Sequence, residues 1–365
     1  MHFHIYERSG FVEIYLNKEA GKVYDLFSSL FITLNYDYYL KELEKYYMVE
    51  DKKFKNKIKD VRQAIEPDIE KYKCFFKPNP SLFSPFVPLH KMWQYKTIDS
   101  YIEYMKTLEE KEIKKELIFQ MEYFGEPWKE VKDPKKIDQL IEDENKFINF
   151  LNKQDFSNED KWNVLYYIKN INKYKGDFIN LIENYKANFE LIFQKYQKEI
   201  DEFSYYLEKE IDEKGIDMEI PIYKYVDTDT IKTIYILPSL FNEYSISQTV
   251  MQNKKESYII LGKSIDKVLF NKYRDDALDR NILVLKNLGD QSKYQFLKLL
   301  SEGEKYGQEI ADNLGITSAT INYHSNNLIC ANLIDVDRRE NKTYFSLNKD
   351  TLREMIRFIE KDFDL

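Results

Sequence analysis

Residues 308–324 read QEIADNLGITSATINYH, and this stretch decides the fold of the C-terminal part of the chain. Apolar residues before its glycine recur at helical spacing, which predicts a short helix over residues 306–314. Gly315 permits a left-handed turn, and Thr317 is a suitable N-cap for a second helix over residues 318–330. The stretch therefore predicts two helices joined by a tight turn.

The flanking residues extend this prediction in both directions. Two helices are expected before it, over residues 279–288 and 291–300, and the second buries Tyr294, Leu297 and Leu300. After it, residues 333–336 and 343–347 alternate as strands around the polar turn 338–342, and a last helix spans residues 351–364. A helix-turn-helix followed by a β-hairpin is a winged helix.

The quoted stretch resembles the signature of ArsR-type transcription regulators. Residues 331–334 (ANLI) also match that family's entry to the wing, with Asn332 where glycine is usual. Asparagine tolerates a left-handed backbone, so the departure is mild. The resemblance covers about ninety of the 365 residues and implies a DNA-binding transcription regulator.

The resemblance also implies which residues meet DNA. They are the start of the recognition helix and the wing, namely Thr317, Ser318, Ala319, Thr320, Asn322, Tyr323, Arg338, Arg339 and Lys342. Helix N-termini bind phosphates, serine and asparagine hydrogen-bond base edges, and alanine contacts the thymine methyl. Wing cations reach a phosphate or the minor groove. His324 faces the protein in this family, so a structural role is expected.

Metal and cofactor chemistry is not expected. Metal sensors of the family use cysteine pairs before the recognition helix or His/Asp sets in the last helix. This sequence has neither ligand set at those positions. His2 and His4 would share a strand face, but a stable site needs further ligands that the sequence does not offer. No G-x-G-x-x-G or H-E-x-x-H motif occurs, so no enzyme is predicted.

The last helix predicts a homodimer. Leu352, Met355, Ile356 and Ile359 form one apolar stripe, the usual dimerisation pattern, and a palindromic operator also requires a dimer. The partners predicted for this region are therefore double-stranded DNA and a second copy of the chain.

The overall charge argues against DNA binding. The chain has a net charge of −8, and residues 288–347 hold six Lys and Arg against eight Asp and Glu. Overall charge would not steer such a chain to DNA, so contacts must come from local cations. The alternative is a winged helix that docks a protein without binding DNA directly.

The length predicts two domains, residues 1–272 and 273–365. Two distant cysteines, no signal peptide and no membrane-length apolar run predict a cytoplasmic protein without a membrane partner. The first domain would sense a small-molecule effector or set the geometry of the dimer.

The first domain is expected to be α+β and mostly helical, with a small β element. Strands are expected in two groups, within residues 2–17 and over 219–226, 231–237 and 257–261, and the groups would pair. Helical patterns cover residues 19–34, 38–65, 98–124, 134–151 and 157–171, with a proline-rich loop over 76–91. One long helix over 176–214, ended by Gly215, is either a spine or part of a dimer interface.

Overall fold

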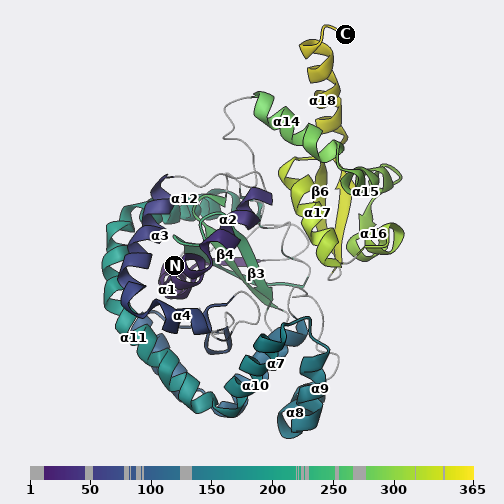
Figure 1. Ribbon diagram of the computed structural model, residues 1–365. Helices are drawn as coiled ribbons and strands as arrows, with labels where there is room; N and C mark the ends of the chain where they lie inside the picture. Colours follow the sequence, from purple (N-terminus) through teal and green to yellow (C-terminus); the bar gives the residue numbers. More distant parts are fainter. Residues whose placement is uncertain are drawn as a thin grey trace.

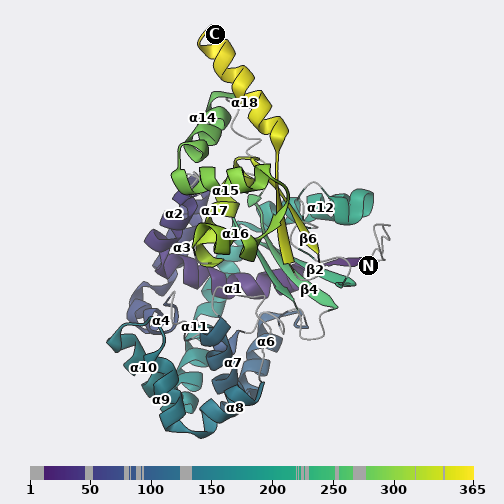
Figure 2. The same cartoon turned by 90° about the vertical axis from the view of Figure 1, so that its right-hand side faces the viewer.

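The computed structural model describes residues 12–45, 52–77, 82, 84–87, 92, 94–123, 134–218, 220, 222, 226, 230–250, 255–265, 277–316, 318–339 and 342–365. Within these residues the chain is mainly helical and carries two small β-sheets (Figure 1) (Figure 2). This confirms the prediction of a mainly helical chain with a small β element. No described helix is long and apolar enough to cross a membrane.

The larger sheet joins the two ends of the first 265 residues. Its strands, in the order β1-β2-β4-β3, are β1 (Glu13–Leu16), β2 (Thr233–Ser239), β4 (Glu256–Gly262) and β3 (Ile246–Val250). The first three are parallel, and β3 runs antiparallel to β4. The predicted pairing of the N-terminal strand with the later strands is confirmed, whereas residues 2–11 lie outside the described residues.

Two strand predictions differ from the structure. The strand expected over residues 219–226 is not formed at Ile220, Ile222 or Val226, which are buried without strand structure, and the other residues of this range lie outside the described residues. Sequence analysis does not predict β3, whose residues ISQTV are mostly polar and follow a segment rich in turn residues. The β3 strand forms because it hydrogen-bonds to the edge of β4. A local sequence pattern does not indicate this pairing.

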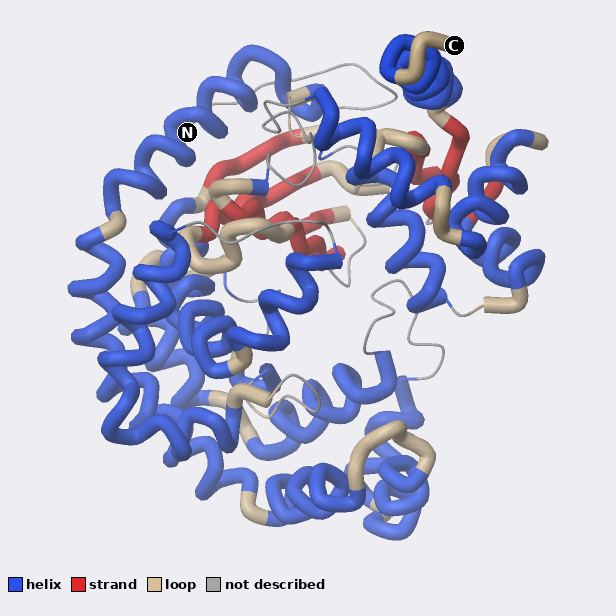
Figure 3. Tube along the Cα trace, turned by 45° about the horizontal axis from the view of Figure 1, so that its top comes forward, coloured by secondary structure: helices blue, strands red, loops and turns tan. Residues whose placement is uncertain are grey.

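Helices cover both faces of this sheet. Ala20 of α1 (Lys18–Leu34) packs on Leu237 and Ile260 on one face. On the other face, Leu207 of α12 (Gln197–Lys214) joins a cluster with Ile234. Alternate residues of β2 therefore serve opposite faces, as strand geometry requires. In the tube view, helices surround the red strands of the sheet (Figure 3).

The remaining helices of this part follow the predicted helical stretches, dividing those over 98–124 and 134–151, and include a helix at residues 69–75 that no predicted stretch covers. They are α2 (Tyr36–Lys45), α3 (Lys52–Ile65), α4 (Ile69–Phe75), α6 (Ile98–Thr107), α7 (Glu110–Tyr123), α8 (Pro134–Glu142), α9 (Glu144–Asn152), α10 (Asn158–Lys169) and α11 (Ile171–Lys195), with short 3-10 turns at Glu66–Asp68, Ser84–Phe86 and Gly215–Asp217. The division at Asp143 has a local cause, because its side chain accepts from two backbone N–H groups and caps α9.

The prediction of one continuous helix over residues 176–214 is wrong. The helix begins earlier, at Ile171, and breaks at Tyr196, after which α12 follows; Gly215, with φ 56°, ends α12 as predicted. The hydroxyl of Tyr196 donates to Asp60 of α3 (2.7 Å). Helical spacing of apolar residues continues across the break, because α11 packs on helices and α12 packs on the sheet.

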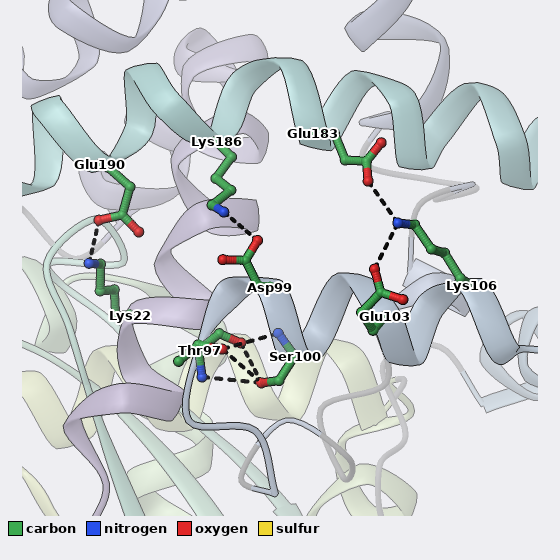
Figure 4. A network of polar contacts seen from close by, with 9 residues as sticks. All are labelled: Lys22, Thr97, Asp99, Ser100, Glu103, Lys106, Glu183, Lys186 and Glu190. Carbon is green, nitrogen blue, oxygen red and sulfur yellow. Dashed lines mark hydrogen bonds and ion pairs between the residues drawn. The ribbon is translucent and has the colours of Figure 1, made fainter.

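The described contacts make α11 a spine of the N-terminal part. Its residues Phe178, Ile182 and Phe189 lie in the largest buried cluster. Ion pairs also hold its exposed side, as Figure 4 shows: Glu190 binds Lys22 of α1, and other pairs join α11 to α6.

The last part of the chain has a separate core. Its elements are α14 (Ala277–Leu288), α15 (Gln291–Ser301), β5 (Lys305–Tyr306), α16 (Gly307–Leu314), α17 (Ser318–Cys330), β6 (Ile334–Arg339), β7 (Lys342–Leu347) and α18 (Lys349–Asp362). One cluster of buried residues between Leu283 and Met355 holds them together. The predicted boundary between residues 272 and 273 lies outside the described residues and stays a prediction.

One core assignment in this part is wrong. Tyr294 is 55% exposed, whereas Phe296 is fully buried beside Leu297 and Leu300. Both tyrosine and phenylalanine fit the helical spacing, but only Phe296 lies on the side of α15 that meets β7, where its ring contacts Phe345.

Candidate nucleic-acid interface

A left-handed glycine sets the angle between α16 and α17. Gly315 has φ 65° and ψ 32°, as predicted, and its N–H donates to the carbonyl of Ala311. The N–H of Ile316 donates to the same carbonyl (3.1 Å). These bonds satisfy the free end of α16 and turn the chain directly into α17.

Apolar contacts fix which side of α17 faces outward. Ile321 and Leu328 are buried in the same cluster as Ile310 and Ala311 of α16. Tyr323, two positions after Ile321, is 37% exposed. Tyr323 therefore lies on the outward side, as the sequence predicts.

The structure describes the other predicted contact residues to different extents. Thr317 lies outside the described residues. Ser318, Ala319 and Asn322 are placed by backbone alone in the first two turns of α17, and Thr320 is half-buried. Ser318, Ala319, Thr320, Asn322 and Tyr323 thus share one short helical segment, which is the arrangement that reading one groove requires.

A group of polar side chains, which sequence analysis misses, lies beneath Tyr323. The Lys293 side chain is buried, with its Nζ 5.9 Å from the centroid of the Tyr323 ring. The His324 ring lies against the same tyrosine, with a centroid distance of 5.4 Å. The one local signal in the sequence is that Lys293 has helical spacing with the apolar residues Leu297 and Leu300.

His324 faces the interior, as expected, and is 8% exposed. Burial lowers the pKa of His324, the Lys293 cation lowers it too, and Asp290 opposes them. The neutral imidazole is therefore the form that the fold accepts.

This pKa shift predicts how stability depends on pH. An unfolded histidine gains a proton near pH 6.5, while folded His324 resists until a lower pH, so the protein loses stability as pH falls through that window. Thermal unfolding of the wild type and of His324→Gln from pH 7.5 to 5.5 should show a larger loss for the wild type. Parallel curves would contradict this.

The hairpin after α17 also begins at a left-handed residue. Asn332, predicted to tolerate this conformation, has φ 54°. Its carbonyl accepts from the Thr351 hydroxyl (2.7 Å), and the N–H of Leu333 donates to Leu328 (2.9 Å). The end of α17 and the start of β6 are thereby joined to α18.

The predicted polar turn 338–342 is wrong in extent. Arg338 pairs with Thr343 and Arg339 with Lys342, so all three cations belong to strands, and the connection is two residues long. Pairing extends further because charged side chains do not prevent strand formation on a solvent-facing hairpin.

A short strand braces the hairpin. Lys305–Tyr306, which sequence analysis does not predict, pairs with β7. The Lys342 Nζ lies 4.5 Å from the centroid of the Tyr306 ring, which holds this cation near the strand end by a cation–π contact.

The described residues offer no metal site. No group of three or more His, Cys, Asp or Glu side chains is arranged around a common point among them. His2 and His4 lie outside this part of the chain.

The chain is similar to a characterised regulator. No family model matches it. Over 87 residues, which are 22% of this chain and 97% of the other protein, it is 33% identical to the transcriptional repressor SdpR of Bacillus subtilis (strain 168).

Proposed function

We propose that this chain, which belongs to the family of the transcriptional repressor SdpR, is a DNA-binding transcription regulator of the ArsR type. The observation that carries the proposal is the helix, left-handed glycine turn, helix and hairpin built by α16, α17, β6 and β7. Residues 277–365 have about the length of the 87-residue match, and we assign the match to them as a winged helix-turn-helix.

In this proposal α17 enters the major groove. Its first turns carry serine, alanine and asparagine, which suit base edges and the thymine methyl group. Tyr323 extends from the same segment, and the buried Lys293 and His324 beneath it limit its motion. The hairpin would then bring Arg338, Arg339 and Lys342 to phosphates.

The wing arginines provide a direct test. Replacing Arg338 and Arg339 with alanine should weaken binding to cognate and random duplexes alike. It should also reduce the slope of log K against log salt by about 0.9 for each phosphate that a subunit no longer binds. Fluorescence anisotropy over a salt series measures this. Lys349→Ala/Lys361→Ala on α18 removes the same charge and should keep the wild-type slope; a wing variant that also keeps it would contradict phosphate binding by the wing.

The homodimer belongs to the same proposal. Leu285 of α14 and Ile356 of α18 are 41% and 58% exposed, and Phe363, the residue that follows α18, is 70% exposed. Of the stripe predicted for dimerisation, Met355 is buried in its own unit, so α18 would offer only the neighbouring side to a partner. Apolar side chains on two adjacent helices suit an isologous contact between copies.

Light scattering tests the dimer. The wild type should have twice the mass of the chain at micromolar concentration, and Ile356→Lys should give the monomer because it places a charge in the contact. Leu191→Lys on α11 alters an equally exposed apolar residue, at 67%, and should leave the dimer intact. A monomeric wild type would contradict the proposal.

We propose a sensing or dimer-setting role for the N-terminal part, with a small-molecule effector, and no enzymatic activity. The alternative function is a protein-docking module without DNA binding. The acidic side chains of the C-terminal part favour it, because α16 carries Glu309 and Asp312 and β6 carries Asp335 and Asp337. If the wild-type protein binds no DNA duplex but does bind a protein partner, the result would support this alternative.

A further inference from the structure

Helix α3 (Lys52–Ile65) differs in charge from every other described helix. It carries five lysines and one arginine against one aspartate. Phe54, Ile58, Val61 and Ile65 are buried and form its inner face. The side chains on its outer face are exposed and basic, and they are Lys52, Lys53, Lys55, Lys59 and Arg62. Positions 52, 55, 59 and 62 follow helical spacing and form one row, called here the α3 basic row.

Several lysines on other described helices are paired with an acid of their own helix or of its N-cap. Lys71 with Asp68, Lys73 with Glu70, Lys106 with Glu103 and Lys114 with Glu110 are examples three or four residues apart. Within α3, the members of the α3 basic row that lie three or four positions apart are all cations, and the nearest acids at these spacings, Asp51 and Glu66, lie just outside the helix in sequence. Like charges at this spacing destabilise a helix, each pair by about 0.2–0.5 kcal/mol. An anionic partner would therefore relieve the repulsion between the cations of the row.

The single acid of α3 does not offset the row. Asp60 Oδ2 accepts from the Lys195 Nζ (2.6 Å) and from the Tyr196 hydroxyl (2.7 Å), so its charge is directed toward α11 and α12. Among the described residues, Lys52, Lys59 and Arg62 have no ion-pair partner.

The helix that carries the row is firmly anchored. The Nζ of the sixth cation, Lys57, is buried between Glu243 (2.8 Å) and Glu199 (3.2 Å). These ion pairs tie α3 to α12 and to the segment after β2, and the apolar inner face packs α3 against α1 and α11. The basic row is thus presented on a rigid element, which lowers the conformational entropy cost of binding.

We propose that the α3 basic row binds the phosphate backbone of duplex DNA outside the site read by α17. This inference rests on the proposed function. The row spans about 15 Å of helix, roughly the axial rise of four phosphates on one DNA strand. DNA is favoured over other polyanions because the chain belongs to a transcription-regulator family. The C-terminal part has more acids than cations, so cations elsewhere in the chain would add to its attraction for DNA phosphates.

The position of α3 determines where DNA would meet it. In Figure 1, α3 lies between α11 and α1 in the N-terminal part, well apart from α17. The row would contact flanking DNA and not the base pairs under the recognition helix. Binding to a long duplex should therefore depend on the row, and binding to a short one should not.

The experiment uses full-length protein with K52Q, K55Q, K59Q and R62Q combined. Glutamine keeps helix propensity and removes charge, so the fold should be retained; circular dichroism checks this. The control combines K71Q, K73Q, K106Q and K114Q, which removes four charges from paired, surface lysines. Binding is measured over a salt series with duplexes of about 20 and 60 base pairs that carry the same central sequence.

The row variant should lose about two to four units of salt slope on the long duplex, near 0.9 for each phosphate it no longer binds. It should match the wild type on the short duplex, and the control variant should match the wild type on both. A row variant that behaves like the control overturns this inference alone. A wild type that binds neither duplex overturns the proposed function as well. The row variant is also tested on phosphatidylserine vesicles. If it loses vesicle binding but keeps the DNA binding of the wild type, the α3 basic row binds a lipid surface and the DNA inference is overturned.

Discussion

Replacing Lys57 with methionine is expected to destabilise the N-terminal part by about 3–5 kcal/mol. The Lys57 and Glu243 side chains are both fully buried, and their charged atoms are 2.8 Å apart. Without the ammonium, the side-chain partners of Glu243 among the described residues are Lys263 (3.0 Å) and the Ser264 hydroxyl (2.8 Å). A buried carboxylate that loses a counter-charge is costly, because water cannot solvate it there.

This network joins distant parts of the chain. Lys57 lies on α3, Glu199 near the start of α12, Glu243 after β2, and Lys263 directly after β4. Glu199 also binds Lys263 (2.9 Å), so two cations and two carboxylates alternate. Its loss would loosen the packing of α3 against the end of the sheet.

Urea unfolding followed by tryptophan fluorescence measures the effect. All three tryptophans lie before residue 163, so their signal reports the N-terminal part alone. The matched control is Lys71→Met, which removes an exposed lysine paired with Asp68 and should change stability by less than about 0.5 kcal/mol. An equally small effect for Lys57→Met would show that the buried pair does not stabilise the fold.

Replacing Asn322 and Tyr323 together with alanine is expected to remove most of the preference for a cognate site. The loss of each interaction with a base should cost about 1–3 kcal/mol, which is roughly tenfold to hundredfold in affinity. Binding to random duplexes should change little, because there the protein binds phosphates. The result is a loss of specificity, in contrast to the uniform weakening expected for the wing arginines.

Competition between cognate and random duplexes separates these effects. The control is Asn313→Ala/Tyr205→Ala, which alters one exposed asparagine of α16 and one exposed tyrosine of α12. It should retain the wild-type preference. If the α17 double variant also retains it, α17 does not read the bases.

Local backbone chemistry explains what the sequence could predict. Gly315 and Asn332 take left-handed conformations because few residue types can, so their identity reveals the turn. The helical spacing of α17 likewise follows from neighbouring residues. These features are confirmed, and the choice of Thr317 as a cap lies outside the described residues.

Long-range pairing explains what the sequence could not predict. Lys57 and Glu243 are 186 positions apart, and nothing near either residue reveals the other. The break at Tyr196 depends on Asp60 of another helix, and β3 depends on the free edge of β4. Lys293 beneath Tyr323 is missed for the same reason, because the burial of a lysine is decided by the elements packed around it.

Recovery of genomic DNA by the purified protein is the most direct test of DNA reading by α17. Full-length protein is incubated with sheared DNA of its source organism, and bound fragments are sequenced beside those bound by the Asn322→Ala/Tyr323→Ala protein. The wild type should enrich fragments that share a two-fold symmetric motif with half-sites about one helical turn apart, and the double substitution should abolish this enrichment. If the two proteins recover the same fragments and the wild type enriches no shared motif, the result would contradict a DNA-reading regulator.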